Sequence, residues 1–120
     1  MPQPESPEHG LAFDLGAIER EMRQEEVYEH NGHTARTLVR APDLRVQLIV
    51  MKGGSRMAEH QASASASIHA LSGQLLLHLP ERRVELAAGQ LLVLGGGLRH
   101  DIEAATDSSL VLTLGWHEEH

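Results

Sequence analysis

The sequence contains no cysteine, a single lysine, few aromatic residues and no long apolar run. The absence of cysteine excludes disulfides and thiolate metal sites, which leaves His, Asp and Glu as the strong metal ligands. It is also compatible with a reducing cytosol. No apolar segment has the length of a membrane span, and the first eight residues lack the basic region and apolar core of a signal peptide. We therefore expect a cytoplasmic protein with no membrane partner.

The charge balance is acidic. Seventeen Asp and Glu residues against ten Lys and Arg residues give a formal net charge of −7. No cluster of Lys and Arg interrupts this balance, so the electrostatic footprint that binds a phosphate backbone is missing. We expect no nucleic-acid partner. The length of 120 residues suits one domain that can bury a core without disulfides or a structural metal.

The chain divides into a tail, a short helix and a strand-rich body. Its start is rich in Pro and Glu, which is typical of a mobile tail. A helix follows, because Leu15, Ile18 and Met22 recur on one face and Asp14 can cap the first turn. The expected division is an N-terminal tail (1–13), a helix (14–25) and a barrel (33–116) forming a single domain (14–116), and a C-terminal tail (117–120).

From His33 onward, short apolar or alternating segments are separated by turns rich in Gly, Pro and Asp. We predict strands over 33–40, 44–52, 62–71, 74–79, 84–86, 90–94, 99–103 and 110–116. No helical pattern separates the later strands, which disfavours a parallel sheet and favours a sandwich or barrel. Where Ala and Ser alternate, Ala62, Ala64 and Ala66 should share one face of a strand.

Two patterns of glycine and histidine resemble the two signature motifs of the cupin superfamily. The first motif is matched in spacing by Gly54, His60 and Gly73, and the second by Gly89, Gly97 and His100. In the second motif, Gly95 takes the place of proline and Ala104 the place of the closing asparagine. The resemblance implies an all-β fold, the double-stranded β-helix or jelly-roll barrel of cupins.

The resemblance also implies where a metal would lie. In cupins the two motif histidines, a second histidine and a glutamate hold a metal inside the barrel. Here Ala62 occupies the place of the second histidine, and Ala66, or Ser67 on the longer spacing, occupies that of the glutamate. Alanine cannot coordinate an ion, and two imidazoles alone bind one weakly. We therefore expect no cofactor; the alternative is a weakly bound divalent transition metal at His60 and His100.

Strand periodicity argues against other ligands near this site. Glu59, Gln61 and Asp101 are sequence neighbours of the motif histidines and should point away from them. His69 and His78 lie an odd number of residues from the inward positions and should face outward. The sequence shows neither a Ser-His-Asp arrangement nor a phosphate-binding loop.

We predict a protein that binds a small molecule in the barrel cavity. The expected pocket comprises His60, Ala62, Ala64, Ala66, His100, Met51 and Met57, with Ile49, Ile68, Leu92 and Leu112 completing the apolar lining. The alternative is a metal-dependent enzyme, dioxygenase- or isomerase-like, that uses His60 and His100, so enzymatic activity stays open. The resemblance to small cupins also implies a homodimer, for which the apolar strand 44–51 is a candidate interface.

Overall fold

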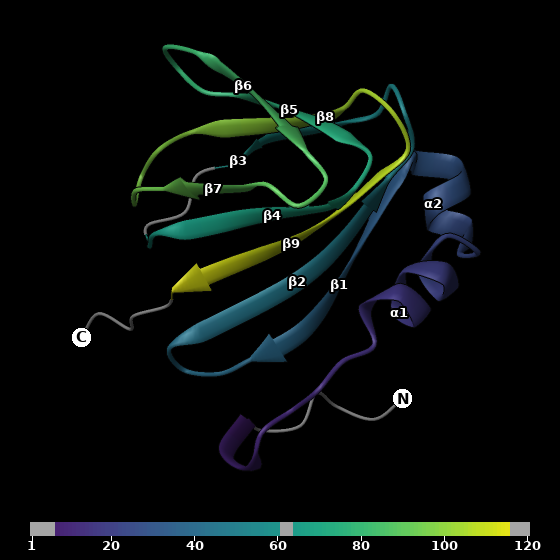
Figure 1. Cartoon of the computed structure of the whole chain (residues 1–120), viewed down its shortest axis with the longest axis vertical. Helices are drawn as coiled ribbons and strands as arrows, with labels where there is room; N and C mark the ends of the chain where they lie inside the picture. The colour runs from purple at the N-terminus through teal and green to yellow at the C-terminus, as the bar shows by residue number, and fades with distance from the viewer. Residues whose placement is uncertain (1–6, 61–63, 116–120) are drawn as a thin grey trace.

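The computed structural model describes residues 7–60 and 64–115, with the backbone alone for residues 58–60. Its strands form a five-stranded antiparallel sheet in the order β1-β2-β9-β4-β7 and a four-stranded one in the order β3-β8-β5-β6 (Figure 1). The strands are β1 (His33–Arg40), β2 (Leu44–Met51), β3 (Arg56–His60), β4 (Ala66–Ser72), β5 (Gln74–His78), β6 (Arg83–Ala87), β7 (Leu91–Leu94), β8 (His100–Ala104) and β9 (Ser108–Gly115). The predicted all-β, jelly-roll architecture is confirmed.

The core of the barrel lies between the two sheets. Alternate residues of several strands point into it, as in Ile49 and Met51 of β2 and in Ile68 and Ala70 of β4. The remaining fully or nearly fully buried members are Leu75, Leu77, Leu86, Leu94, Ile102, Ala104 and Leu110. This strand periodicity of two is the pattern expected of a sheet with one face in a core. Of the residues proposed for the apolar lining, Ile49, Met51 and Ile68 belong to this core, and Met57, Leu92 and Leu112 pack against it.

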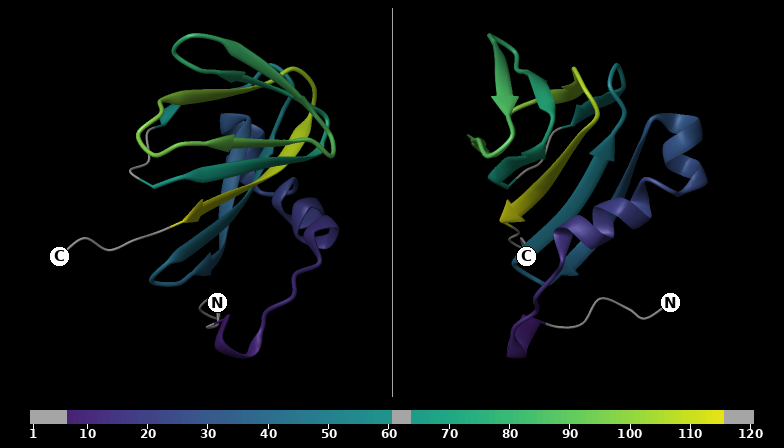
Figure 2. Two further views of the ribbon diagram at one scale, coloured as in Figure 1. Left: turned by 60° about the vertical axis from the view of Figure 1, so that its left-hand side comes forward. Right: turned by 45° about the vertical axis from the view of Figure 1, so that its right-hand side comes forward.

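A second apolar core lies on the outer face of the five-stranded sheet. There Leu48 and Val50 of β2 pack under two helices, α1 (Leu15–Met22) and α2 (Glu26–Asn31). Figure 2 shows both helices against the outer side of β1 and β2. Strand β2 also has neighbours on both edges, β1 and β9. Its apolar composition therefore serves two cores of one chain, and no subunit interface is needed to explain it.

The helical region departs from the predicted single helix. Asp14 caps α1 as expected, its Oδ1 accepting a hydrogen bond from the Ala17 backbone N–H at 3.1 Å, but α1 ends at Met22 and α2 follows. Arg36 of β1 bridges the junction, with a guanidinium nitrogen 2.8 Å from Glu25 and the other 3.1 Å from Glu21. These hydrogen bonds raise the pKa of Arg36. In the predicted N-terminal tail, Pro7–His9 form a 3₁₀-helix and Leu11 packs against the second core.

Two strand predictions differ from the structure. Strand β3 was not predicted, because Arg56–His60 carries charges at both ends and no apolar alternation. Strand β4 begins at Ala66, four residues later than expected, since Ala64 and Ser65 lie in a bend and an irregular segment. Within the described part of the chain, no helix has the length and apolar character of a membrane span.

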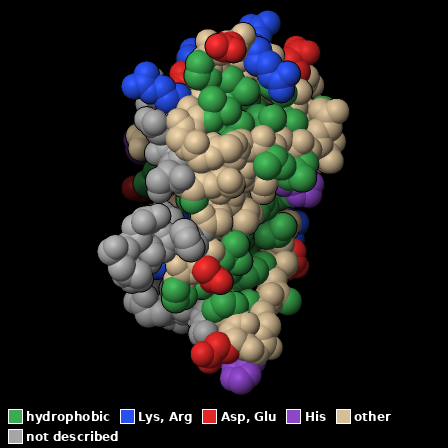
Figure 3. Space-filling view, turned by 90° about the vertical axis from the view of Figure 1, so that its left-hand side faces the viewer, with side chains coloured by type: hydrophobic (Ala, Val, Ile, Leu, Met, Phe, Trp, Pro, Cys, Tyr) green, Lys and Arg blue, Asp and Glu red, His purple; other side chains and the backbone are tan. Residues whose placement is uncertain are grey.

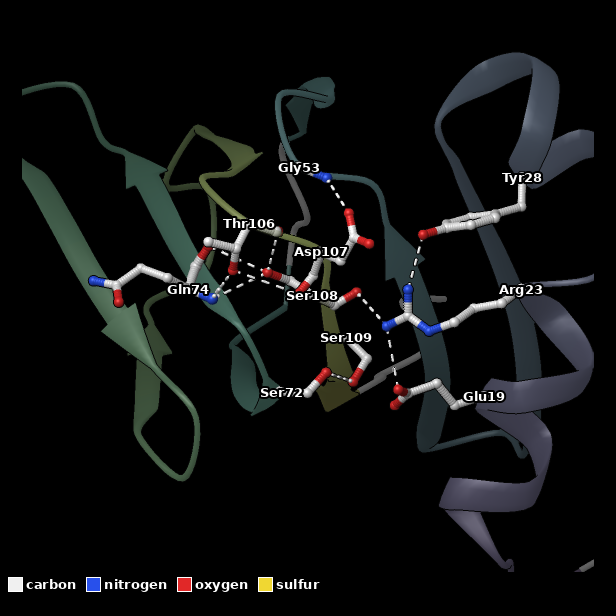
Figure 4. A network of polar contacts seen from close by, with 10 residues as sticks. All are labelled: Glu19, Arg23, Tyr28, Gly53, Ser72, Gln74, Thr106, Asp107, Ser108 and Ser109. Carbon is white, nitrogen blue, oxygen red and sulfur yellow. Dashed lines mark hydrogen bonds and ion pairs between the residues drawn. The ribbon is translucent and has the colours of Figure 1, made fainter.

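The turn between β8 and β9 (105–107) closes one end of the barrel (Figure 4). The Gly53 N–H donates to Asp107 Oδ1 at 2.8 Å. The completely buried Ser108 hydroxyl accepts from the Gln74 N–H at 3.1 Å and donates to the Thr106 carbonyl at 2.7 Å. Arg23 donates to the Ser108 carbonyl at 3.4 Å, which joins the helices to the same end.

Gly73 is required by this closure. Its φ is +77°, and a Cβ atom at this position would overlap the Asp107 carbonyl oxygen and the Ser108 hydroxyl. We expect Gly73→Ala to lower the free energy of unfolding by at least about 2 kcal/mol, because backbone strain and overlap add. Urea denaturation followed by far-UV circular dichroism would measure the change.

The matched control is Gly54→Ala. Gly54 has a similar φ of +88°, but no atom lies within 4 Å of where a Cβ would stand. This variant should lose about 1 kcal/mol, the cost of the left-handed conformation alone. Equal losses in the two variants would contradict the assignment of a packing role to Gly73.

Candidate functional site

The candidate site lies at the other, open end of the barrel. Strand β8 begins there at His100, and strand β5 ends there at His78. The turn 79–82 between β5 and β6 and the loop 95–99 between β7 and β8 both lie at this end, on the left in Figure 1. Side chains that are distant in sequence therefore meet around one opening.

His100 is the predicted site residue whose position the structure defines best. It is 4% exposed and points inward with Ile102 and Ala104, in agreement with the predicted periodicity. Its Nδ1 lies 3.2 Å from the Leu98 carbonyl oxygen. A carbonyl can only accept, so this contact requires a proton on Nδ1. In the neutral ring, Nε2 is then the nitrogen with the lone pair, suited to accepting a proton or hydrogen bond.

The other motif histidine is paired with His100 through the backbone. In the register of β3 and β8, His60 lies opposite His100, after an irregularity that follows the pair Met57 and Ile102. The backbones of the two motif positions are therefore adjacent on neighbouring strands.

The remaining predicted pocket residues are dispersed. Ala66 is 5% exposed at the start of β4, and Ala64 is half-buried in the preceding segment. Ala62 lies outside the described residues. Met51 is completely buried in the barrel core, near the closed end, where it is paired with Ser108. Met57 packs against the same core.

Two depressions lie at the open end. The smaller has a volume of about 250 Å³ and is lined by His78, Leu79, Pro80, Arg99, His100 and Asp101. The larger, of about 420 Å³, is lined by Leu79, Pro80, Glu81, Arg82 and Leu98. They share Leu79 and Pro80 and therefore adjoin one another. We call this pair of depressions the mouth site.

The mouth site includes residues that the sequence did not indicate. Its apolar wall and its arginines come from the turn 79–82 and from Leu98 and Arg99. Leu79 and Arg99 were predicted as the ends of strands, and the other residues as connections between strands. The one clue to these residues in the sequence was their position. Each segment directly adjoins a strand end that carries a histidine, His78 or His100. No spacing rule says that the two segments converge.

His69, His78 and Asp101 face outward as predicted, whereas Gln61 and the side chain of Glu59 lie outside the described part of the chain. His69 is exposed on β4. His78 is half-buried on the outer side of β5, its Nε2 2.8 Å from a carboxylate oxygen of Glu103. Asp101 accepts two hydrogen bonds from Arg56, at 2.6 and 3.2 Å. His78 and Asp101 thus contribute to the rim of the mouth site while each is held by a neighbour on the outer surface.

Two other groups of histidines belong to neither motif. His30 lies in the last turn of α2 and His33 begins β1, with Gly32 between them in the left-handed conformation at φ +81°. The C-terminal histidines, His117 and His120, lie outside the described residues, as does Trp116.

Of the four positions at which the resemblance places metal ligands, the structure describes the side chains of His100 and of the glutamate position. Ala66 stands in the interior at the glutamate position and offers a methyl group, and Ser67 on the longer spacing offers only a hydroxyl. Among the side chains that the structure describes, no three His, Asp or Glu residues come together as a group that could hold an ion.

Comparison with known proteins identifies the fold. No family model matches the sequence, and no curated protein matches it. A conserved protein of unknown function from Streptococcus pyogenes is similar in structure, with a TM-score of 0.72 and 22% identity over 99% of this chain and 98% of that one. A cupin superfamily protein from Desulfitobacterium hafniense has a TM-score of 0.69 and 13% identity, covering 72% and 80% of the two chains.

An enzyme structure is also similar. Salicylate 1,2-dioxygenase from Pseudoaminobacter salicylatoxidans, determined as adducts with gentisate, has a TM-score of 0.80 and 17% identity. The match covers 96% of this chain but 35% of the dioxygenase, so this chain spans about a third of that enzyme. At these identities the likeness is one of fold, and the fold is the cupin barrel.

Proposed function

We propose that this protein binds a small organic molecule at the mouth site. The observation that carries the proposal is the pair of adjoining depressions that share Leu79 and Pro80, one of which reaches His100. Sites for small molecules are concave and mainly apolar, with a few polar groups that fix the orientation of the ligand. Leu79, Pro80 and Leu98 supply the apolar wall here, and His100 and the arginines supply the polar groups.

The histidines are the polar contacts that we propose for the ligand at the mouth site. The hydrogen bond between His100 and the Leu98 carbonyl fixes the orientation of the imidazole ring, and His100 lines the smaller depression. The resemblance in motif spacing predicts His60 as a second polar contact for the ligand, and the backbone of His60 is paired with that of His100.

Titration with 2-naphthamide, a neutral aromatic probe, tests the proposed function. We expect amide shifts in the ¹H–¹⁵N spectrum for Leu79, Leu98 and His100, with saturation at one equivalent. Replacing Leu98, which is 36% exposed, by Ser should weaken binding by about fivefold, because part of the apolar wall is lost. Val27, which is 50% exposed on α2, provides the control: Val27→Ser should bind as the natural chain does. Shifts spread over the whole surface would contradict the proposal.

The second candidate is a metal-dependent enzyme, favoured by the pairing of His60 with His100 across β3 and β8. Such an enzyme would use these imidazoles with water or a ligand that completes the set. Elemental analysis of protein purified without a metal-affinity column separates the two candidates. We expect iron, manganese, nickel and zinc at well below one equivalent. One equivalent that is lost in His100→Ala and retained in His69→Ala would favour the enzyme.

We propose a homodimer that forms through β7 instead of β2. Strand β7 is an edge strand, and Leu91 and Val93 on its outer face are 59% and 66% exposed. The edge strands of the two described sheets are β1, β3, β6 and β7, and β7 alone carries no charged residue. Charged residues normally protect exposed edges from pairing. A second copy placed antiparallel along β7 would bring no like charges together, although each chain is acidic.

Size-exclusion chromatography with light scattering tests the dimer. We expect twice the mass of one chain at micromolar concentration, and a single chain for Val93→Lys, because the two-fold arrangement would bring two lysines together. Val27→Lys adds the same charge at a similarly exposed position and should remain dimeric. A single chain in the unmodified protein would contradict the proposed pairing.

A further inference from the structure

We propose that the ligand of the mouth site is an organic anion with a compact apolar body, such as an aromatic carboxylate, whose charge is held by Arg82 and Arg99. This inference rests on the proposed function and specifies the chemical class of the ligand. Arg82 lines the larger depression and Arg99 the smaller, and the depressions meet at Leu79 and Pro80.

The position of the arginines is informative because the protein is acidic. Its formal net charge is −7, so a ligand anion would be repelled by most of the molecular surface. Two of the few cationic side chains line the mouth site. Arginine presents a planar fork of donors that matches a carboxylate, and such bidentate pairs are stronger than neutral hydrogen bonds.

Arg82 is available for a ligand. Its backbone carbonyl accepts a hydrogen bond from the Leu79 N–H at 2.8 Å, which fixes the turn that carries it. Within the described part of the chain, its guanidinium has no hydrogen-bond or ion-pair partner. The same turn holds Leu79 and Pro80 beside it, so that cation and apolar wall come from one short segment.

The carboxylates around the mouth site are mostly compensated. Asp101 is bound by Arg56 at 2.6 Å, and Glu103 lies 2.8 Å from His78. Among the described lining residues, Glu81 is the remaining carboxylate without such a partner. The same lining includes two arginines, and the Arg82 guanidinium has no partner in the described part of the chain. This balance favours a monoanion, whose binding Glu81 opposes weakly.

The apolar wall of the mouth site requires that the ligand has an apolar body as well as a negative charge. Leu79, Pro80 and Leu98 offer hydrocarbon surface and no hydrogen-bonding side chain. Figure 3 views this end of the molecule, where hydrophobic side chains gather beneath arginine and carboxylate side chains at the top of the view. A small inorganic anion would leave this wall exposed to water. A ring or short hydrocarbon body that carries one carboxylate would cover the wall and reach an arginine.

The test compares 2-naphthoate with 2-naphthamide, which has nearly the same shape and no charge. Isothermal titration calorimetry, with the site located by amide shifts, should show the carboxylate binding about fivefold more tightly, the upper range for a partly exposed ion pair. The double variant Arg82→Gln/Arg99→Gln should bind the two probes equally. Glu81→Gln should strengthen binding of naphthoate by about twofold, since it removes the opposing charge.

Arg83→Gln is the matched control. Arg83 is the exposed neighbour of Arg82, lies on β6 and lines neither depression, so its loss should leave the fivefold preference in place. Equal binding of the two probes to the unmodified protein, or a preference that survives the double variant, would overturn the assignment of an anion while the proposed function stands. Binding of neither probe would overturn the proposed function itself.

Discussion

The packing of the turn between β8 and β9 against Gly73 holds the two sheets together at one end of the barrel. Ala104 donates to the Ser55 carbonyl at 3.0 Å and Ala105 to that of Gln74 at 2.9 Å, so the register of β8 is fixed against both neighbouring strands. Alternation along β8 then turns Ala104, Ile102 and His100 inward. The orientation of His100 at the mouth site is thus set by contacts at the opposite end of the molecule.

Periodicity in the sequence is sufficient to predict the barrel and much of its interior. β1 was predicted with its observed bounds, because Gly32 and Pro42 flank a β-branched segment. The inward direction of His100 and Ala66 was predicted from the alternation of side chains between the two faces of a strand. The prediction failed where side chains are small or charged. β4 could not be delimited within a run of Ala and Ser, and α2 contributes a single buried side chain, Tyr28, which is too little for a helical pattern.

The mouth site could not be predicted in the same way. Its residues come from a turn and a loop that meet only because β5 and β8 are neighbours in one sheet. Such convergence depends on strand order, and alternation within a strand carries no information about order. The motif histidine His100 lies at the end of the barrel where we propose the site. The wall formed by Leu79, Pro80 and Leu98 becomes visible only when the sheet is assembled.

The two faces of strand β2 lie in different cores, and this restricts changes in its length. Leu48 and Val50 belong to the core under the helices, while Ile49 and Met51 belong to the barrel. Insertion or deletion of one residue within this strand would exchange the two sets and disrupt both cores together. Length changes should therefore be tolerated poorly in β2 and more readily in the turn 79–82 and the loop 95–99. In this protein, the segments that can vary in length over evolution are those that surround the opening.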